Sequence, residues 1–281
     1  MQAVILAAGK GTRMKSGRAK VLHPVLGVPL LEHVLRTVEA TSAKPIAVVV
    51  GHQAETVEAT FAGRGLTFVR QEPPLGTGHA VQVAREAFAA HPDRTLLVVN
   101  GDVPLLRPET LKRLLAVHRE RGAAATLLTV VLDDPGAYGR VVRDGKGGVN
   151  AIVEAKDATD DVRGIREINA GLYVFEVPAL LGVLGKLQPQ NAQGEFYLTD
   201  VVGLLRAGGH QVAAVAAEDP DEGLGVNSIA ELSAATRTLR ARRERLPPRR
   251  GAPGGGRWMR SRRARGPMPR RPAARAPRRR R

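Results

Sequence analysis

The sequence contains no cysteine among its 281 residues. This absence excludes disulfide bonds, thiolate metal sites and a cysteine nucleophile. The seven histidines show no spacing typical of metal ligands, and the G-x-S-x-G motif of serine hydrolases is missing. An enzyme with this sequence must therefore work without a thiol, a histidine-bound metal or that serine motif.

Long apolar runs are also missing. No stretch approaches the ~20 residues that span a bilayer. The only apolar stretch before the first basic residues, Ala3–Ala8, is too short for the core of a signal peptide. We therefore expect a soluble, cytoplasmic protein with no membrane partner.

Acidic residues are nearly absent from the C-terminal segment 240–281. It holds 18 arginines, no lysine and a single acid, Glu244, so residues 1–239 carry 25 basic and 26 acidic residues. The net charge of +16 thus comes from this segment. With seven prolines, five glycines and few large apolar side chains, residues 244–281 cannot bury enough surface to fold, and we expect them to be disordered.

The arginines of this segment raise one alternative function, non-specific binding of nucleic acid. They could neutralise phosphates in a salt-dependent, sequence-independent manner. The segment has one aromatic residue, Trp258, so base stacking has little support. We expect no specific nucleic-acid partner.

Residues 1–239 alternate between short β-branched runs and helical patterns, which predicts an α/β protein with a Rossmann-like, mixed but mostly parallel sheet and helices on both faces. The predicted strands are 3–7, 46–50, 67–69, 95–99, 125–132, 140–143, 149–154, 171–175 and 212–216. The predicted helices are 30–39, 55–61, 79–89, 108–121, 180–187, 199–207 and 227–243. The stretch Gly145–Gly148 predicts a hairpin turn.

The first strand opens into a glycine-rich, cationic loop that includes Gly9 and Arg13. Such a loop is suited to phosphate because glycine allows close backbone approach and exposed N–H groups meet the anion. It matches neither the P-loop spacing nor the dinucleotide fingerprint. The alternative is a tight turn with solvated cations. Lys20, further along, could fold back and add charge.

Two later loops also follow predicted strands. The loop from Gln71 to Gly78 is either a plain proline/glycine connection or a base-reading loop, since glutamine offers both a donor and an acceptor. Asp102, after the strand 95–99, is either a turn residue or a Mg²⁺ ligand.

Four single residues have side chains or positions suited to binding a sugar. They are Gly139, Glu154, Asn169 and Asn227, and glutamate and asparagine side chains are natural partners for sugar hydroxyls. Asn227 is equally compatible with an N-cap of the last helix.

Nine motifs occur in order along residues 1–240. They are LAAGKGTRM (6–14), KVLH (20–23), QEPPLGTGHA (71–80), GDVPL (101–105), LDDPGAYGR (132–140), IVEAKDAT (152–159), EINAG (167–171), NAQGEFYLTD (191–200) and GVNS (225–228). Together they resemble the uridylyltransferase domain of the bifunctional N-acetylglucosamine-1-phosphate uridylyltransferases, in the sugar nucleotidyltransferase superfamily.

This resemblance implies a nucleotide-diphospho-sugar transferase fold and a role for each matched residue. Nucleotide binding would fall to Leu6, Ala7, Ala8, Gly9, Gln71, Gly76 and Thr77, phosphate binding to Arg13 and Lys20, Mg²⁺ binding to Asp102 and Asn227, and sugar binding to Gly139, Glu154 and Asn169. Asn100, where an aromatic residue often precedes the Gly-Asp pair, is left out of this site.

The implied reaction joins UTP and N-acetylglucosamine 1-phosphate to give UDP-N-acetylglucosamine and pyrophosphate. It proceeds by Mg²⁺-assisted in-line attack, for cell-wall precursor synthesis. A relative that uses another sugar or base is the same-class alternative.

The bifunctional enzymes of this family continue into a β-helix of hexapeptide repeats, which acetylates glucosamine 1-phosphate and forms a trimer. No such repeat follows in this sequence, so we expect neither acetyl transfer nor trimer formation. The expected parts are a catalytic domain (1–227), a helical arm (228–243) and the tail (244–281).

Overall fold

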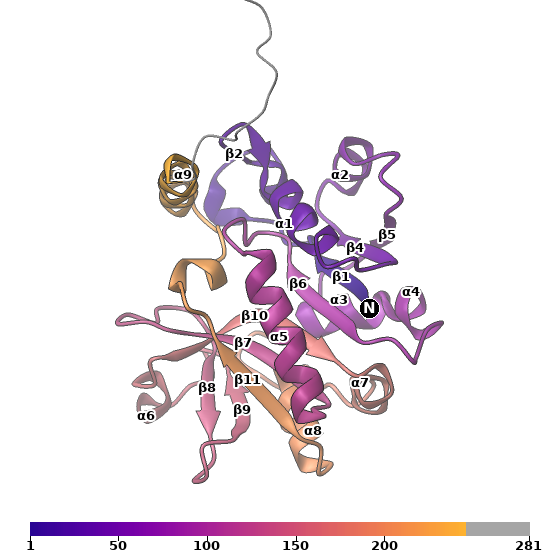
Figure 1. Ribbon diagram of the computed structural model, residues 1–281, viewed down its shortest axis with the longest axis vertical. Helices are drawn as coiled ribbons and strands as arrows, with labels where there is room; N and C mark the ends of the chain where they lie inside the picture. Colours follow the sequence, from indigo (N-terminus) through magenta and orange to yellow (C-terminus); the bar gives the residue numbers. More distant parts are fainter. Residues whose placement is uncertain (246–281) are drawn as a thin grey trace, which may run out of the picture. The chain divides into compact units, whose positions relative to one another are not determined.

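Within residues 1–245, which the computed structural model describes, nine strands pair into one mixed sheet (Figure 1). They are β1 (Gln2–Leu6), β4 (Ile46–Val50), β5 (Thr67–Arg70), β6 (Leu96–Asn100), β7 (Ala125–Val131), β8 (Arg140–Arg143), β9 (Val149–Val153), β10 (Glu167–Phe175) and β11 (Val212–Ala216). The main path runs β11-β7-β10-β6-β1-β4-β5. The tail beyond Arg245 lies outside the described residues.

The half of the sheet nearest the N-terminus is parallel. Strand β1 pairs with β4 and β6 in parallel, and β4 with β5. Strand β10 then runs antiparallel between β6 and β7, and β8 pairs with both β10 and β9. The carboxyl ends of β1, β4, β5 and β6 therefore meet at one edge together with the start of β10. Open α/β sheets bind their ligands at such an edge.

Helices connect the strands. They are α1 (Leu30–Glu39), α2 (Ala54–Thr60), α3 (Thr77–Val83), α4 (Arg85–Ala89), α5 (Pro108–Arg121), α6 (Asp160–Arg163), α7 (Val177–Leu184), α8 (Asp200–Ala207) and α9 (Ile229–Glu244). Short 3-10 turns are η1 (Thr12–Met14), η2 (Lys20–Leu22) and η3 (Pro220–Gly223), and a small hairpin joins β2 (Pro24–Val25) to β3 (Val28–Pro29). Among residues 1–245, no helix combines the length and apolar character needed to cross a membrane.

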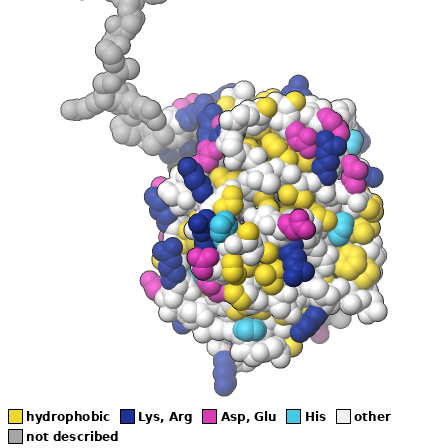
Figure 2. All heavy atoms as spheres, turned by 90° about the vertical axis from the view of Figure 1, so that its right-hand side faces the viewer, with side chains coloured by type: hydrophobic (Ala, Val, Ile, Leu, Met, Phe, Trp, Pro, Cys, Tyr) yellow, Lys and Arg dark blue, Asp and Glu magenta, His cyan; other side chains and the backbone are white. Residues whose placement is uncertain are grey.

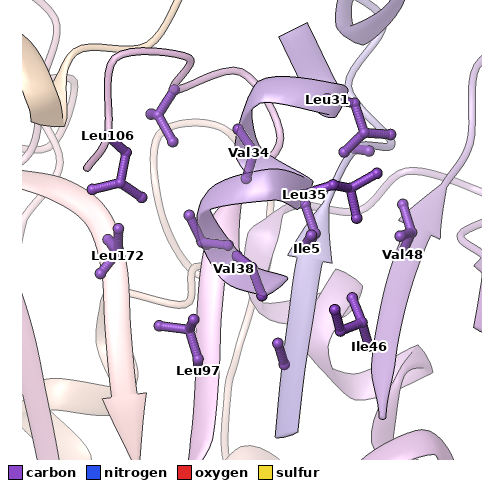
Figure 3. Close-up of a cluster of buried hydrophobic side chains, with 14 of the residues drawn as sticks. Ile5, Leu31, Val34, Leu35, Val38, Ile46, Val48, Leu97, Leu106 and Leu172 are labelled. Carbon is purple, nitrogen blue, oxygen red and sulfur yellow. The ribbon is translucent and has the colours of Figure 1, made fainter. Parts of the chain in front are cut away.

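A core on each face of the sheet explains why the strands are apolar throughout. On one face, α1 packs Leu31 and Leu35, which lie one helical turn apart, against Ile5 and Val48 of the sheet (Figure 3). On the other face, residues of α3, α7 and α8 cover Val4 and its counterparts in β4 and β6. Because successive side chains of a strand point to opposite faces, both cores draw on the same strands.

The predicted α/β class, with a mixed and mostly parallel sheet covered on both faces, is confirmed. The predicted hairpin is also present: β8 and β9 are antiparallel, and Asp144 Oδ1 accepts from the backbone N–H of Lys146 and Gly148 at 2.9 and 2.8 Å. One predicted helix, 79–89, is in fact two, α3 and α4, which meet at Ala84.

Helix α9 closes the described part of the chain. Its Ala235 packs with Val226, Leu105 and Val25 in a third, smaller cluster, and α9 lies beside β2 in Figure 1. Met1–Arg245 form one compact unit. The finer division at residues 227 and 243 stays a prediction.

Candidate active site

A cleft of about 630 Å³ opens at the carboxyl edge of the parallel strands. Its size lies within the range of small-molecule sites. The resemblance gave a role to fourteen residues, and all of them except Arg13 line this cleft. The thirteen are Leu6, Ala7, Ala8, Gly9, Lys20, Gln71, Gly76, Thr77, Asp102, Gly139, Glu154, Asn169 and Asn227. The fold thus brings segments from the whole described chain to one place.

The loop after β1 contacts the stem of Lys20. Gly11 has a φ of +60°, and a Cβ atom there would lie 2.7 Å from the Cβ of Lys20. Glycine is therefore needed on two counts, since the left-handed backbone and the close contact both exclude a side chain. As a result Lys20, in η2, folds back beside the glycine-rich loop.

The ammonium of Lys20 bridges two candidate metal ligands. It donates to Asp102 Oδ2 and lies 3.1 Å from Asn227 Oδ1. The side chains of Lys20 and Asp102 are only 14% and 12% exposed, so water screens the pair weakly. The backbone N–H of Val226 donates to the Asp102 carbonyl at 2.9 Å, which holds the two segments together.

Asp102 and Asn227 fit a hard divalent cation. One carboxylate oxygen and one carboxamide oxygen converge on a single positive charge, the Lys20 ammonium, which stands in for such an ion. No group of three or more His, Asp or Glu side chains within residues 1–245 could hold a metal. A site with two oxygen ligands suits Mg²⁺, which keeps waters and substrate phosphates in its shell.

Asn227 is not the N-cap of the last helix. Ser228 fills that position: its hydroxyl accepts from the Glu231 N–H at 3.2 Å, and the Glu231 carboxylate accepts from the Ser228 N–H at 3.1 Å. This capping box leaves the Asn227 side chain available to the cleft.

The loop after β5 is pinned to a distant segment. Gly78 N–H donates to the Phe196 carbonyl at 2.7 Å, and the Leu198 N–H donates to Thr77 Oγ1 at 3.1 Å. A Cβ on Gly76, whose φ is +103°, would lie 2.6 Å from the Phe196 oxygen. Gln71 is 3% exposed and donates through Nε2 to the Gly76 carbonyl at 2.8 Å. Its Oε1 has no hydrogen-bond donor among the described residues and can accept from a ligand.

The candidate sugar residues lie together in the cleft, where the Asn169 N–H donates to the Gly139 carbonyl at 2.9 Å. Glu154 Oε1 accepts from Thr199 Oγ1 at 3.1 Å and would contact a side chain at Gly139. Burial raises the pKa of Glu154 more than this hydrogen bond lowers it. The Asn169 carboxamide is already used within the protein, donating to Tyr173 Oη at 2.6 Å and accepting from Gly171 N–H at 3.1 Å.

One predicted residue lies apart from this lining. Arg13 is exposed and does not line the cleft, although its charge acts on the hydroxyl of Tyr138, whose pKa burial raises. Lys10 lines the cleft instead. Asn100, which was left out of the predicted site, and Tyr138, which had no predicted role, also line the cleft. The position of Asn100 at the carboxyl end of a buried strand was the available signal.

Comparison with known proteins identifies the family. The family model of the MobA-like NTP transferase domain matches residues 3–165. The chain belongs to the MobA-like NTP transferase domain family. Two curated relatives, each named bifunctional protein GlmU, are similar to it. That of Pelobacter propionicus is 49% identical over 85% of this chain and 52% of its own length, and that of Brevibacillus brevis is 48% identical over 86% and 52%.

The chain thus spans about half the length of the curated relatives that it matches. A solved structure of UDP-glucose pyrophosphorylase complexed with UDP-glucose has the same fold, with a TM-score of 0.70, 16% identity, and coverage of 86% of this chain and 98% of that one. The expected nucleotide-diphospho-sugar transferase fold is therefore confirmed. As a member of this NTP transferase family, the protein is a nucleotidyltransferase.

Proposed function

We propose that the protein transfers UMP from UTP to N-acetylglucosamine 1-phosphate, releasing pyrophosphate. One observation carries the proposal: Lys20, Asp102 and Asn227 converge beside the glycine-rich loop, in a cleft that the candidate base-reading and sugar-binding residues also line. The choice of uridine and of N-acetylglucosamine rests on the nine-motif resemblance.

The nucleotide lies along the loop after β1. The backbone of Ala8 and Gly9 meets the phosphates, and nothing lies within 4 Å of a Cβ built on Gly9, so the approach is open. The free Gln71 Oε1 accepts from the N–H of uracil, while Gly76 presents its backbone. Lys20 turns from Asp102 to the phosphates.

Asp102 and Asn227 hold the metal, which we propose is Mg²⁺. When bound, Mg²⁺ neutralises charge that develops on the phosphate oxygens. The protein adds the positive charges of Lys20 and of Arg13, which lies outside the cleft lining but acts on the hydroxyl of Tyr138 within it. No general base is required, because the attacking oxygen belongs to a phosphate that is already anionic. This explains why a nucleophile, a histidine base and an orienting acid are not needed.

The sugar phosphate lies against Glu154, Gly139 and the strand of Asn169. Glu154 accepts from a sugar hydroxyl, with its orientation fixed by Thr199. Asn169, held by Tyr173 and Gly171, shapes the wall. Attack is in line on the α-phosphorus, opposite the leaving pyrophosphate. The product would serve cell-wall precursor synthesis in the cytoplasm.

A panel assay tests this function. Pyrophosphate release is measured for UTP, dTTP, CTP and ATP, each with N-acetylglucosamine 1-phosphate, glucose 1-phosphate and glucosamine 1-phosphate, and ³¹P NMR identifies the product. We expect the highest kcat/KM for UTP with N-acetylglucosamine 1-phosphate, with UDP-sugar and pyrophosphate formed in equal amounts. Preference for glucose 1-phosphate or dTTP would overturn the substrate assignment and favour the same-class alternative.

A further inference from the structure

A carboxylate behind the cleft, Glu222 in η3, is almost completely buried, at 2% exposure. Its Oε2 accepts from the backbone N–H of Arg107 at 3.0 Å and from Thr110 Oγ1 at 2.5 Å, and its Oε1 lies 3.0 Å from Arg107 Nε. A buried carboxylate persists only when its oxygens are satisfied, and here one segment satisfies both of them.

The partners of Glu222 belong to the start of α5. Arg107 is the N-cap of this helix, and its own side chain makes no capping hydrogen bond. Glu222 accepts from the backbone N–H of this N-cap residue and from the Thr110 hydroxyl in the first turn, and its negative charge interacts favourably with the positive end of the helix dipole. A residue remote in sequence thereby fixes where α5 begins.

The contact of Glu222 with Arg107 and Thr110, called the Glu222 clamp below, lies close in the chain to the two candidate metal ligands. Arg107 follows Asp102 by five residues, and Glu222 precedes Asn227 by five. The contact therefore joins the two segments that carry the two ligands. On the Glu222 side the chain is tightly held, since a Cβ on Gly223 would lie 2.5 Å from Val130 Cγ2.

A second, more exposed layer surrounds the clamp. Arg107 Nη2 pairs with Asp219 at 2.7 Å, and Arg242 of α9 pairs with the same carboxylate at 2.8 Å. The Asp219 side chain is 33% exposed, whereas that of Glu222 is 2% exposed. Loss of Asp219 can be compensated by water, and loss of the Glu222 charge cannot.

We propose that Glu222 is a positioning residue that sets the separation of Asp102 and Asn227 and thereby the affinity for the divalent cation. The proposal rests on the metal site of the proposed function. Replacing Glu222 with glutamine removes the negative charge and leaves an N–H₂ group facing at least one donor, which is Arg107 Nε if the amide oxygen keeps the Arg107 N–H and the Thr110 hydroxyl. The segment that leads to Asn227 must then shift, although Asn227 itself is unchanged.

The test is direct binding of Mn²⁺, measured by the loss of the free-ion EPR signal, on the full chain with saturating UDP-N-acetylglucosamine. Glu222→Gln is compared with the wild type, with Asp219→Asn as the neighbouring control and Leu205→Ala as a destabilised control in the far core. Thr110→Val, which removes one donor at nearly constant volume, provides a milder second variant. The melting temperature of each variant is recorded.

We expect Glu222→Gln to raise the Kd for Mn²⁺ about tenfold, at the lower end of the effect for groups that contact metal ligands directly, and Thr110→Val to raise it less. Asp219→Asn and Leu205→Ala should leave it within twofold of the wild type. Unchanged Mn²⁺ affinity in both clamp variants, while Asp102→Asn abolishes binding, overturns the role of Glu222 alone. Unchanged affinity in Asp102→Asn overturns the metal site and the clamp together.

Discussion

The Nζ atom of Lys20 lies 3.1 Å from the Oδ1 atom of Asn227, although 207 residues separate them in the chain. The same ammonium donates to Asp102. Lys20 therefore occupies the position between the two oxygens that the proposed divalent cation would take. Under the proposed function, the lysine and the cation would compete until a triphosphate draws the ammonium away.

Replacement of Lys20 by methionine tests this competition. Lys20→Met should bind Mn²⁺ more tightly than the wild type when no nucleotide is present, because the competing charge is gone. The same variant should release pyrophosphate about 10²-fold more slowly, since a cation that stabilises the phosphates is lost. Lys10→Met, which removes another lysine of the cleft lining, is the matched control. Weaker Mn²⁺ binding by Lys20→Met would contradict the competition.

The contact between Gly76 and Phe196 predicts a steric requirement in the loop from Gln71 to Gly78. Gly76→Ala should lower the melting temperature and raise the KM for UTP, because its Cβ would lie 2.6 Å from a backbone oxygen. Gly63→Ala is the control: its φ is +78°, yet nothing lies within 4 Å of the added carbon. It should lose only about 1–2 kcal/mol of stability and no UTP affinity. Equal effects in the two variants would exclude the steric explanation.

The buried position of Glu154 predicts a pH dependence of stability. Its pKa in the folded protein lies above the ordinary value of 4.5. Its contribution to stability is therefore complete below the pKa of the unfolded chain and is lost as the pH rises through the folded-state pKa. Glu154→Gln removes this loss. The melting temperature of the variant minus that of the wild type should therefore increase as the pH rises from 4.5 to 8.

The same Glu154→Gln variant should raise the KM for N-acetylglucosamine 1-phosphate, because the amide accepts a hydroxyl proton less well than a carboxylate does. Ligand-free calorimetry at the two pH values and initial rates at pH 8 measure the two effects. Glu120→Gln, on the exposed side of α5, controls for simple loss of charge. A melting-temperature difference that does not change with pH would refute the burial effect.

The proposed site predicts that residues 246–281 are dispensable for turnover, since all fourteen residues to which the resemblance gives a role lie between Leu6 and Asn227. On the face shown in Figure 2, basic and acidic side chains are interspersed, and residues 1–239 carry nearly equal numbers of the two. Chain 1–245 should release pyrophosphate at the full rate and lose any low-salt binding to DNA. Loss of turnover in a folded 1–245 chain would favour the nucleic-acid alternative.

The sequence predicted most of the sheet and its helices because apolar periodicity follows directly from burial. The helix 30–39 and the strand 46–50 have the predicted bounds. The break at Ala84 was missed because it lies within a continuous apolar pattern. The Asp102–Asn227 pairing depends on a long-range fold, so only the family resemblance predicted it. The Glu222 clamp was missed for the same reason, as nothing local distinguishes a buried glutamate from an exposed one.

The pyrophosphate-release rate of Asp102→Asn, with UTP, N-acetylglucosamine 1-phosphate and Mg²⁺ all saturating, tests the central claim most directly. The substitution keeps the size of the side chain and removes the charge that we propose holds the cation. We predict a rate at least about 10²-fold below that of the wild type, with a circular dichroism spectrum like that of the wild type. A folded variant that turns over at a near-normal rate in Mg²⁺ would contradict the account.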